Sequence, residues 1–113
     1  MKSDAVYLQH ILDAIHKIES YVTVGRDVFM SASHWQDAVI RQFQIIGEAT
    51  KGLSRNLRSR HPEVPWQRVA GLRDFLIHEY FDVDLVALWD LTQTSLPGFK
   101  EQVASILREL ARK

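Results

Sequence analysis

Cysteine is absent from this sequence of 113 residues. Its absence excludes a disulfide framework, thiolate zinc sites, iron–sulfur clusters and a cysteine nucleophile. Long apolar runs are also missing, because the longest, Leu85 to Trp89, is far shorter than the roughly 20 residues that span a bilayer. No apolar segment of the kind found in secretory signals precedes Gly25. We therefore expect a cytoplasmic protein without a membrane span.

Glycine-rich phosphate loops and complete sets of metal ligands are missing as well. The five glycines are scattered, and no G-x-x-x-x-G-K motif occurs. Asp13 and His16 have the spacing of a carboxylate–histidine metal pair, but no Glu-x-x-His elsewhere completes a two-metal site. His10 and His34 are flanked by polar residues, as on a solvated helix face. We therefore expect neither a metal nor a cofactor.

The chain has no net charge, but its charges are unevenly distributed. Residues 51–73 carry six basic side chains against Glu63 alone, and residues 74–99 carry five acidic side chains and no lysine or arginine. The basic stretch is either a surface that follows the phosphates of a polyanion or the solvated face of a helix. If it binds RNA, the candidate residues are Lys51, Arg55, Arg58 and Arg68.

Apolar residues recur at helical spacing in the first half of the chain, and no stretch alternates as a strand would. The first predicted helix carries its apolar face over residues 8–22, with Ser3 or Asp4 as its cap and Gly25 at its end. A second, long helix is predicted over residues 33–57, because Ser33-His34-Trp35-Gln36 has the spacing of a capping box.

Prolines determine the boundaries in the second half. Pro62 and Pro65 must end the second helix, and Pro65 suits the first turn of a third helix over residues 66–80. A fourth, short helix then starts after an aspartate cap, Asp82 or Asp84.

The dipeptide Pro97-Gly98 is expected to separate the fourth helix from a fifth over residues 99–110. Short connections between long helices favour antiparallel neighbours. The sequence therefore predicts one all-α domain, residues 1–113, folded as an up-and-down bundle of four to five helices.

The third predicted helix concentrates the side chains that could perform chemistry. Arg73, Asp74, His78 and Tyr80 lie within eight residues. Arginine binds phosphate through a planar fork of donors, and histidine can take or give a proton near neutral pH. Together they could cleave an RNA phosphodiester without a metal: the histidine moves a proton at the 2′-hydroxyl or the 5′-oxygen, and the arginine neutralises charge on the phosphate.

Helix geometry separates the two central residues. Five residues at about 100° each place Arg73 and His78 roughly 140° apart around the axis, whereas Arg73 and Tyr80 nearly share a face. Either the helix distorts near His78, or two chains meet about a two-fold axis and form a composite cleft. In a third interpretation Arg73 pairs with Asp74 or Asp82 at the surface, and His78 has no catalytic role.

The segment Arg73-Asp74-(x)3-His78-x-Tyr80 resembles the R-x4-6-H motif of HEPN-domain ribonucleases. The H-x-Y extension, the following residues 81–84 and the upstream segment Phe43-Gln-Ile-Ile-Gly-Glu-Ala49 are similar to the HepT branch of that family. The resemblance covers nearly the whole chain, and the motif with its flanks is more specific than an R-x4-H alone.

The resemblance implies an all-helical bundle that forms a homodimer, or a higher homo-oligomer, with the two motifs facing one cleft. It implies metal-independent RNA cleavage by Arg73 and His78, with Asp74 as the polar orienting residue. HepT proteins are toxins of two-gene, type II toxin–antitoxin modules, so the implied partner is a minimal, MntA-like nucleotidyltransferase. That antitoxin would attach AMP to Tyr80.

Two other function classes remain compatible with the sequence. One is a non-catalytic HEPN-type module that binds nucleotide or supports a nucleotidyltransferase, although such modules are expected to lack the paired arginine and histidine. The other is a plain dimerising helical scaffold. A gene for a small nucleotidyltransferase next to this one would favour the toxin.

Overall fold

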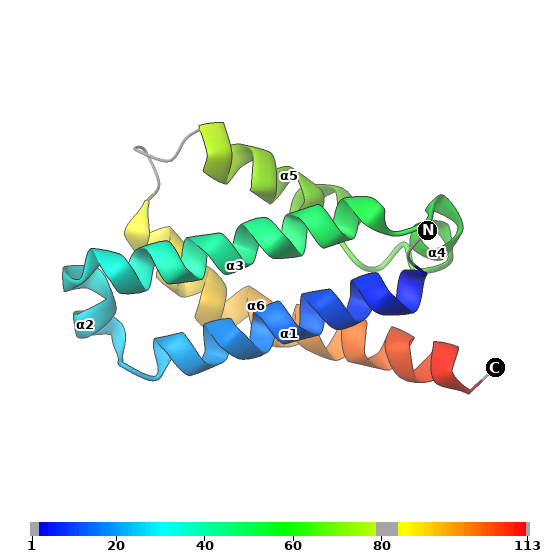
Figure 1. The fold of residues 1–113 in the computed structure, drawn as a ribbon, viewed down its shortest axis with the longest axis horizontal. Helices are drawn as coiled ribbons and strands as arrows, with labels where there is room; N and C mark the ends of the chain where they lie inside the picture. Colours follow the sequence, from blue (N-terminus) through cyan, green and yellow to red (C-terminus); the bar gives the residue numbers. More distant parts are fainter. Residues whose placement is uncertain (1–2, 79–83, 113) are drawn as a thin grey trace.

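The computed structural model describes residues 3–78 and 84–112, and of residues 73–78 it describes the backbone only. The described residues form six helices and no strand, which confirms the predicted all-α bundle (Figure 1). The helices are α1 (Asp4–Val22), α2 (Arg26–Ser31), α3 (Ser33–Gly52), α4 (Arg55–Arg60), α5 (Trp66–His78) and α6 (Leu85–Ala111).

The long helices run up and down, and α3 lies between α1 and α5 (Figure 1). Helix α6 packs against α1, and the short helix α2 closes one end of the bundle against α3 and α6. The core consists of aliphatic and aromatic side chains from α1, α3 and α6, to which α2 adds Phe29, α4 adds Leu57 and α5 adds Trp66. Helix α5, which carries the candidate catalytic residues, is therefore an outer helix that packs chiefly on α3.

The boundaries of α1 agree with the sequence prediction. The Ser3 hydroxyl accepts a hydrogen bond from the Val6 N–H at 3.4 Å, so Ser3 caps the helix, and Asp4 is the first helical residue. Gly25, which follows the end of α1, has a φ of 93°, a conformation that L side chains rarely adopt. A glycine is therefore needed where the chain turns into α2.

The predicted long helix over residues 33–57 is wrong, because the chain leaves the helix at Leu53 and restarts as α4. At the break, a Cβ on Gly52 would overlap the ring of Tyr7, so a glycine lets α1 approach this closely. Ser54 then caps α4, its hydroxyl accepting a hydrogen bond from the Leu57 N–H at 3.1 Å. The helix therefore breaks at the Gly52–Tyr7 contact and the Ser54 cap, although the helical spacing of apolar residues continues in the sequence.

The predicted capping box at Ser33 is also wrong. The residue at the cap position of α3 is Ala32, and no side chain caps this helix. The amide of Gln36 instead donates to the carbonyl oxygens of Phe29 and Met30, at 2.9 and 3.2 Å, which lie near the end of α2. Gln36 therefore joins α3 to α2 rather than closing its own first turn.

The fourth and fifth predicted helices are one continuous helix, α6, which runs through Pro97. Asp84 is its cap, as one of the two predicted alternatives, and its carboxylate accepts from the N–H groups of Val86 and Ala87. A proline inside a helix removes one backbone hydrogen bond but need not end the helix. Leu96 and Phe99, on either side of Pro97, are both buried, so packing maintains the helix across it.

Among the described residues, none of the helices is both long enough and apolar enough to cross a membrane.

Candidate functional site

Helix α5 is fixed to the bundle at its first turn. The Trp66 side chain is buried and donates from Nε1 to the carbonyl oxygen of His61 at 3.0 Å. Its ring meets Phe99 of α6 edge-on, with the ring centroids 6.2 Å apart. Further along the helix, Val69 and Leu72 pack against the core. These contacts set the rotation and direction of the helix that carries the motif.

The predicted catalytic residues Arg73, Asp74 and His78 all belong to α5, and Tyr80 lies outside the described residues. Because α5 is helical up to His78, positions 73 and 78 are separated by five residues of one helix, or about 140° around its axis. Positions 73 and 74 are adjacent on that helix. Within one chain, therefore, the helix alone does not bring positions 73 and 78 onto a common face.

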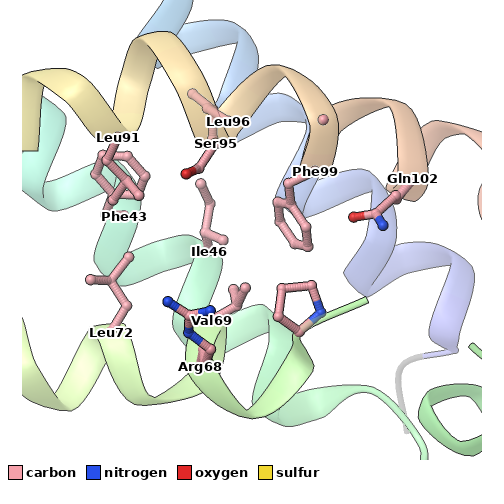
Figure 2. A pocket seen from close by; sticks show the side chains of 12 residues that line it. Phe43, Ile46, Arg68, Val69, Leu72, Leu91, Ser95, Leu96, Phe99 and Gln102 are labelled. Atoms are coloured by element: carbon pink, nitrogen blue, oxygen red, sulfur yellow. The ribbon is translucent and has the colours of Figure 1, made fainter. Parts of the chain in front are cut away.

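An apolar pocket of about 450 Å³ lies between α5 and α6 (Figure 2). Phe43 and Ile46 of α3 lie between the two helices, Leu72 and Val69 approach from α5, and Leu91 and Phe99 are among the residues from α6. Its polar lining comes from Arg68, Ser95 and Gln102. The pocket thus borders the same helix as Arg73 and lies on its α6 side.

A second pocket, of about 620 Å³, lies where α4 meets the start of α5. Three of the four predicted RNA-binding residues line it: Arg55 and Arg58 from α4, and Arg68 from α5. Its other lining residues are Ser59, Pro62, Val64, Pro65, Trp66, Gln67 and Ala70. The structure therefore gathers three arginines that are spread over fourteen positions of the sequence, and we call this the arginine pocket.

Lys51, the fourth predicted RNA-binding residue, does not line the arginine pocket. It is exposed at the end of α3, where it interacts with another residue. The basic stretch is thus divided into three arginines that line one pocket and a lysine that lies apart from them. The break after Gly52 separates them.

Sequence reasoning missed the part that the aromatic residues play in the two pockets. Phe43, Trp66 and Phe99 have the helical spacing of core residues, and all three are buried, yet each also forms part of a pocket wall. Helical spacing could not distinguish these roles, since it reports only that a residue faces inward. Among the residues that the structure describes, no three histidine, aspartate or glutamate side chains gather as a metal site would require.

Comparison with known families matches residues 11–106 to the model of the family described as "HepT-like: Ribonuclease HepT-like". The match includes the whole of α5 and the complete segment 73–80. The chain belongs to the HepT-like family.

Curated proteins from other organisms resemble this HepT-like chain over most of its length. A "Putative RNase" of Caldanaerobacter subterraneus subsp. tengcongensis is 37% identical over 96% of this chain and 98% of its own. A "Probable ribonuclease HepT" of Thermococcus cleftensis is 39% identical over 88% of this chain and 91% of its own.

A larger relative, from Methanocaldococcus jannaschii, is described as a "Gamma-glutamylcyclotransferase and putative RNase". It is 41% identical over 97% of this HepT-like chain, which spans 50% of that relative's length. No solved structure matches the chain significantly.

Proposed function

We propose that this HepT-like chain is a metal-independent endoribonuclease whose catalytic residues are Arg73 and His78. The observation that carries the proposal is the family match over residues 11–106, which contains both residues on one outer helix. The relatives named as RNases support the same activity. Arginine can stabilise charge on a phosphate and histidine can transfer protons, so the two together can cleave RNA without a metal.

Each residue has a distinct task in the proposed reaction. His78 takes the proton of the ribose 2′-hydroxyl, whose oxygen attacks the adjacent phosphorus. The bond from phosphorus to the 5′-oxygen breaks, and that oxygen receives a proton. Arg73 binds the phosphate oxygens and stabilises the charge that grows on them. Asp74 orients the pair. The products end in a 2′,3′-cyclic phosphate and a 5′-hydroxyl.

The proposed active form is a homodimer in which α5 of each chain faces one cleft. The 140° between positions 73 and 78 supports this arrangement, because a two-fold axis can bring Arg73 of one chain to His78 of the other. The same symmetry supplies two histidines. One can then act as the base and the other as the acid.

The proposed partner is an MntA-like nucleotidyltransferase, and the pair form a type II toxin–antitoxin module. The partner transfers AMP from ATP to the hydroxyl of Tyr80, and pyrophosphate leaves. The new phosphodiester brings a negative charge and a bulky adenosine seven residues from Arg73. RNA would be repelled and Arg73 occupied by the modification, without any change of fold.

The test of the proposed activity uses purified protein, a fluorescent single-stranded RNA, and the variants Arg73→Ala and His78→Ala. Each variant should lose at least about 100-fold in cleavage rate, because His78→Ala removes a general acid–base group and Arg73→Ala removes a group that stabilises charge on the phosphate. The control is His16→Ala, which removes an exposed histidine of α1. Cleavage should persist in EDTA. Cleavage that survives in His78→Ala, or that needs magnesium, would overturn the proposal.

The same experiment separates cleavage from binding. If the wild-type chain binds RNA or AMP but cleaves nothing, the chain belongs instead to the non-catalytic HEPN-type modules that bind nucleotide or support a nucleotidyltransferase.

A further inference from the structure

The arginine pocket concentrates positive charge without an acidic residue in its lining. Arg55, Arg58 and Arg68 contribute three guanidinium groups, and the other lining residues are neutral. Two acidic residues near α4, Glu63 in the sequence and Asp4 in the fold, contact other groups. Glu63 lies 3.9 Å from Nδ1 of His61, and Asp4 binds Ser54 through both carboxylate oxygens. In the part of the chain that the structure describes, no ion pair involves these three arginines.

Arg58 is the most enclosed of the three arginines. Its side chain is half-buried, and its Nε is inaccessible to water and has no hydrogen-bond acceptor among the described residues. A charged group that loses water without gaining a partner is costly to the fold. The Nε–H of Arg58 therefore has no acceptor in the described part of the free protein, and an anion in the pocket would place negative charge beside this guanidinium.

The lining also suits a nucleic acid rather than a bare ion. The exposed rings of Pro62 and Pro65 form apolar walls beside the arginines, and the indole of Trp66 lies buried in the lining. Gln67 and Ser59 add neutral hydrogen-bonding groups, both on exposed residues. A positively charged groove that follows the phosphates is typical of sites that hold a single nucleic-acid strand.

We propose that the arginine pocket is a subsite that binds a phosphate of the RNA strand several nucleotides away from the cleaved bond. The substrate in this inference rests on the proposed ribonuclease function. Arg68 and His78 are ten residues apart on α5, or about 15 Å along the axis. At about 3.4 Å per stacked nucleotide, this distance corresponds to roughly four nucleotides. The subsite would hold long RNA and leave a dinucleotide untouched.

Binding is measured with a single-stranded RNA decamer and chains that also carry His78→Ala, so that the RNA stays intact. Arg58→Gln should weaken binding about tenfold and lower the slope of log affinity against log salt by about 0.7. The matched control is Arg60→Gln, which removes the same charge from an exposed residue of α4 outside the pocket. It should change both quantities less.

Two further variants protect the test against misfolding, since Arg58 is half-buried. Arg55→Gln and Arg68→Gln alter exposed residues of the same pocket and should weaken RNA binding in the same direction. Circular dichroism checks that each variant is folded. Equal losses in Arg60→Gln and in all three pocket variants would show diffuse attraction and overturn the subsite.

A titration with AMP and with inorganic phosphate distinguishes the source of the phosphate group. The decamer should bind far more tightly than either small molecule, and its binding should depend on Arg58. A pocket that binds AMP in an Arg58-dependent way, while decamer binding ignores Arg58, would be a nucleotide site and would overturn the proposal.

Substrate length separates this inference from the proposed function. In the otherwise wild-type enzyme, Arg58→Gln should reduce kcat/KM for the decamer more than for a dinucleotide. If the wild-type chain cleaves no RNA but the His78→Ala chain binds the decamer through Arg58, the subsite stands and the ribonuclease proposal fails. If cleavage depends on His78 while Arg58→Gln behaves like Arg60→Gln, the ribonuclease stands and the subsite fails.

Discussion

Asp4, at the start of α1, accepts two hydrogen bonds from Ser54, the residue that caps α4. Its Oδ1 accepts from the backbone N–H of Ser54 at 2.8 Å, and its Oδ2 accepts from the hydroxyl at 2.7 Å. The same hydroxyl accepts from the Leu57 N–H. Residues fifty positions apart thus fix the point at which the chain restarts as a helix, directly before Arg55 and Arg58.

We predict that Asp4→Asn destabilises the protein and loosens α4. The substitution leaves only one side-chain oxygen to accept from Ser54 and removes a negative charge from the first turn of α1. Because the hydrogen bonds lie at the surface, we expect a loss of about 1–2 kcal/mol in the free energy of unfolding. Urea denaturation measures it. Asp90→Asn, which removes an exposed carboxylate from α6, is the control, and an equal loss there would contradict the role of Ser54.

Replacing Gly52 and Gly71 by alanine should change the stability of the protein in opposite directions. In Gly52→Ala the new Cβ meets the ring of Tyr7, and the clash should cost about 1–3 kcal/mol of stability. In Gly71→Ala the Cβ meets nothing within 4 Å, and α5 should gain about 0.5–1 kcal/mol. Thermal denaturation compares the two. Adding Tyr7→Leu to Gly52→Ala should recover part of the loss, and an additive double variant would show that the contact does not limit packing.

Mixing two inactive variants tests the composite cleft. If Arg73 of one chain works with His78 of the other, unfolding and refolding Arg73→Ala and His78→Ala together should restore cleavage above that of either variant alone. Half of the randomly paired dimers then contain one intact Arg–His pair across the axis. Refolding each variant by itself is the control. No recovery in verified mixed dimers would mean that both residues act within one chain or that cleavage needs His78 of both chains.

Tyr80→Phe should escape silencing by the nucleotidyltransferase partner. The chain has three tyrosines, so co-expression with the partner followed by intact mass and peptide mapping identifies the modified residue. AMP should appear on Tyr80 of the wild-type chain and should be absent from Tyr80→Phe, which remains toxic. Tyr21→Phe, in which the replaced ring packs beside Trp35, should be modified and silenced normally. Neutralisation of Tyr80→Phe would indicate inhibition by binding alone.

The helices that the sequence predicts well are those with local boundaries. Ser3 and Asp84 cap α1 and α6 through their own side chains, so the signal lies within a few residues. The break between α3 and α4 could not be predicted in this way. It depends on Tyr7 and Asp4, which approach Gly52 and Ser54 only in the folded chain.

In the candidate site, too, features within one helix could be predicted and features that depend on tertiary contacts could not. The spacing of Arg73 and His78 could be read directly, because both belong to one helix. That Arg55 and Arg58 lie near Arg68 could not be predicted from the sequence. Their position depends on the break before α4, whereas the sequence predicted one continuous helix through residue 57. The helix boundary predicted at Pro97 was also wrong, because buried neighbours maintain the helix there.

The position of α5 at the edge of the bundle affects how the molecule opens. A helix that packs chiefly on one neighbour can detach at a lower free energy than global unfolding requires. Its amide hydrogens should therefore exchange with deuterium sooner than those of α1 and α3, which pack against each other. The helix that carries Arg73 and His78 would then be an early unit to come loose, and catalysis would fade on heating before the rest of the bundle melts.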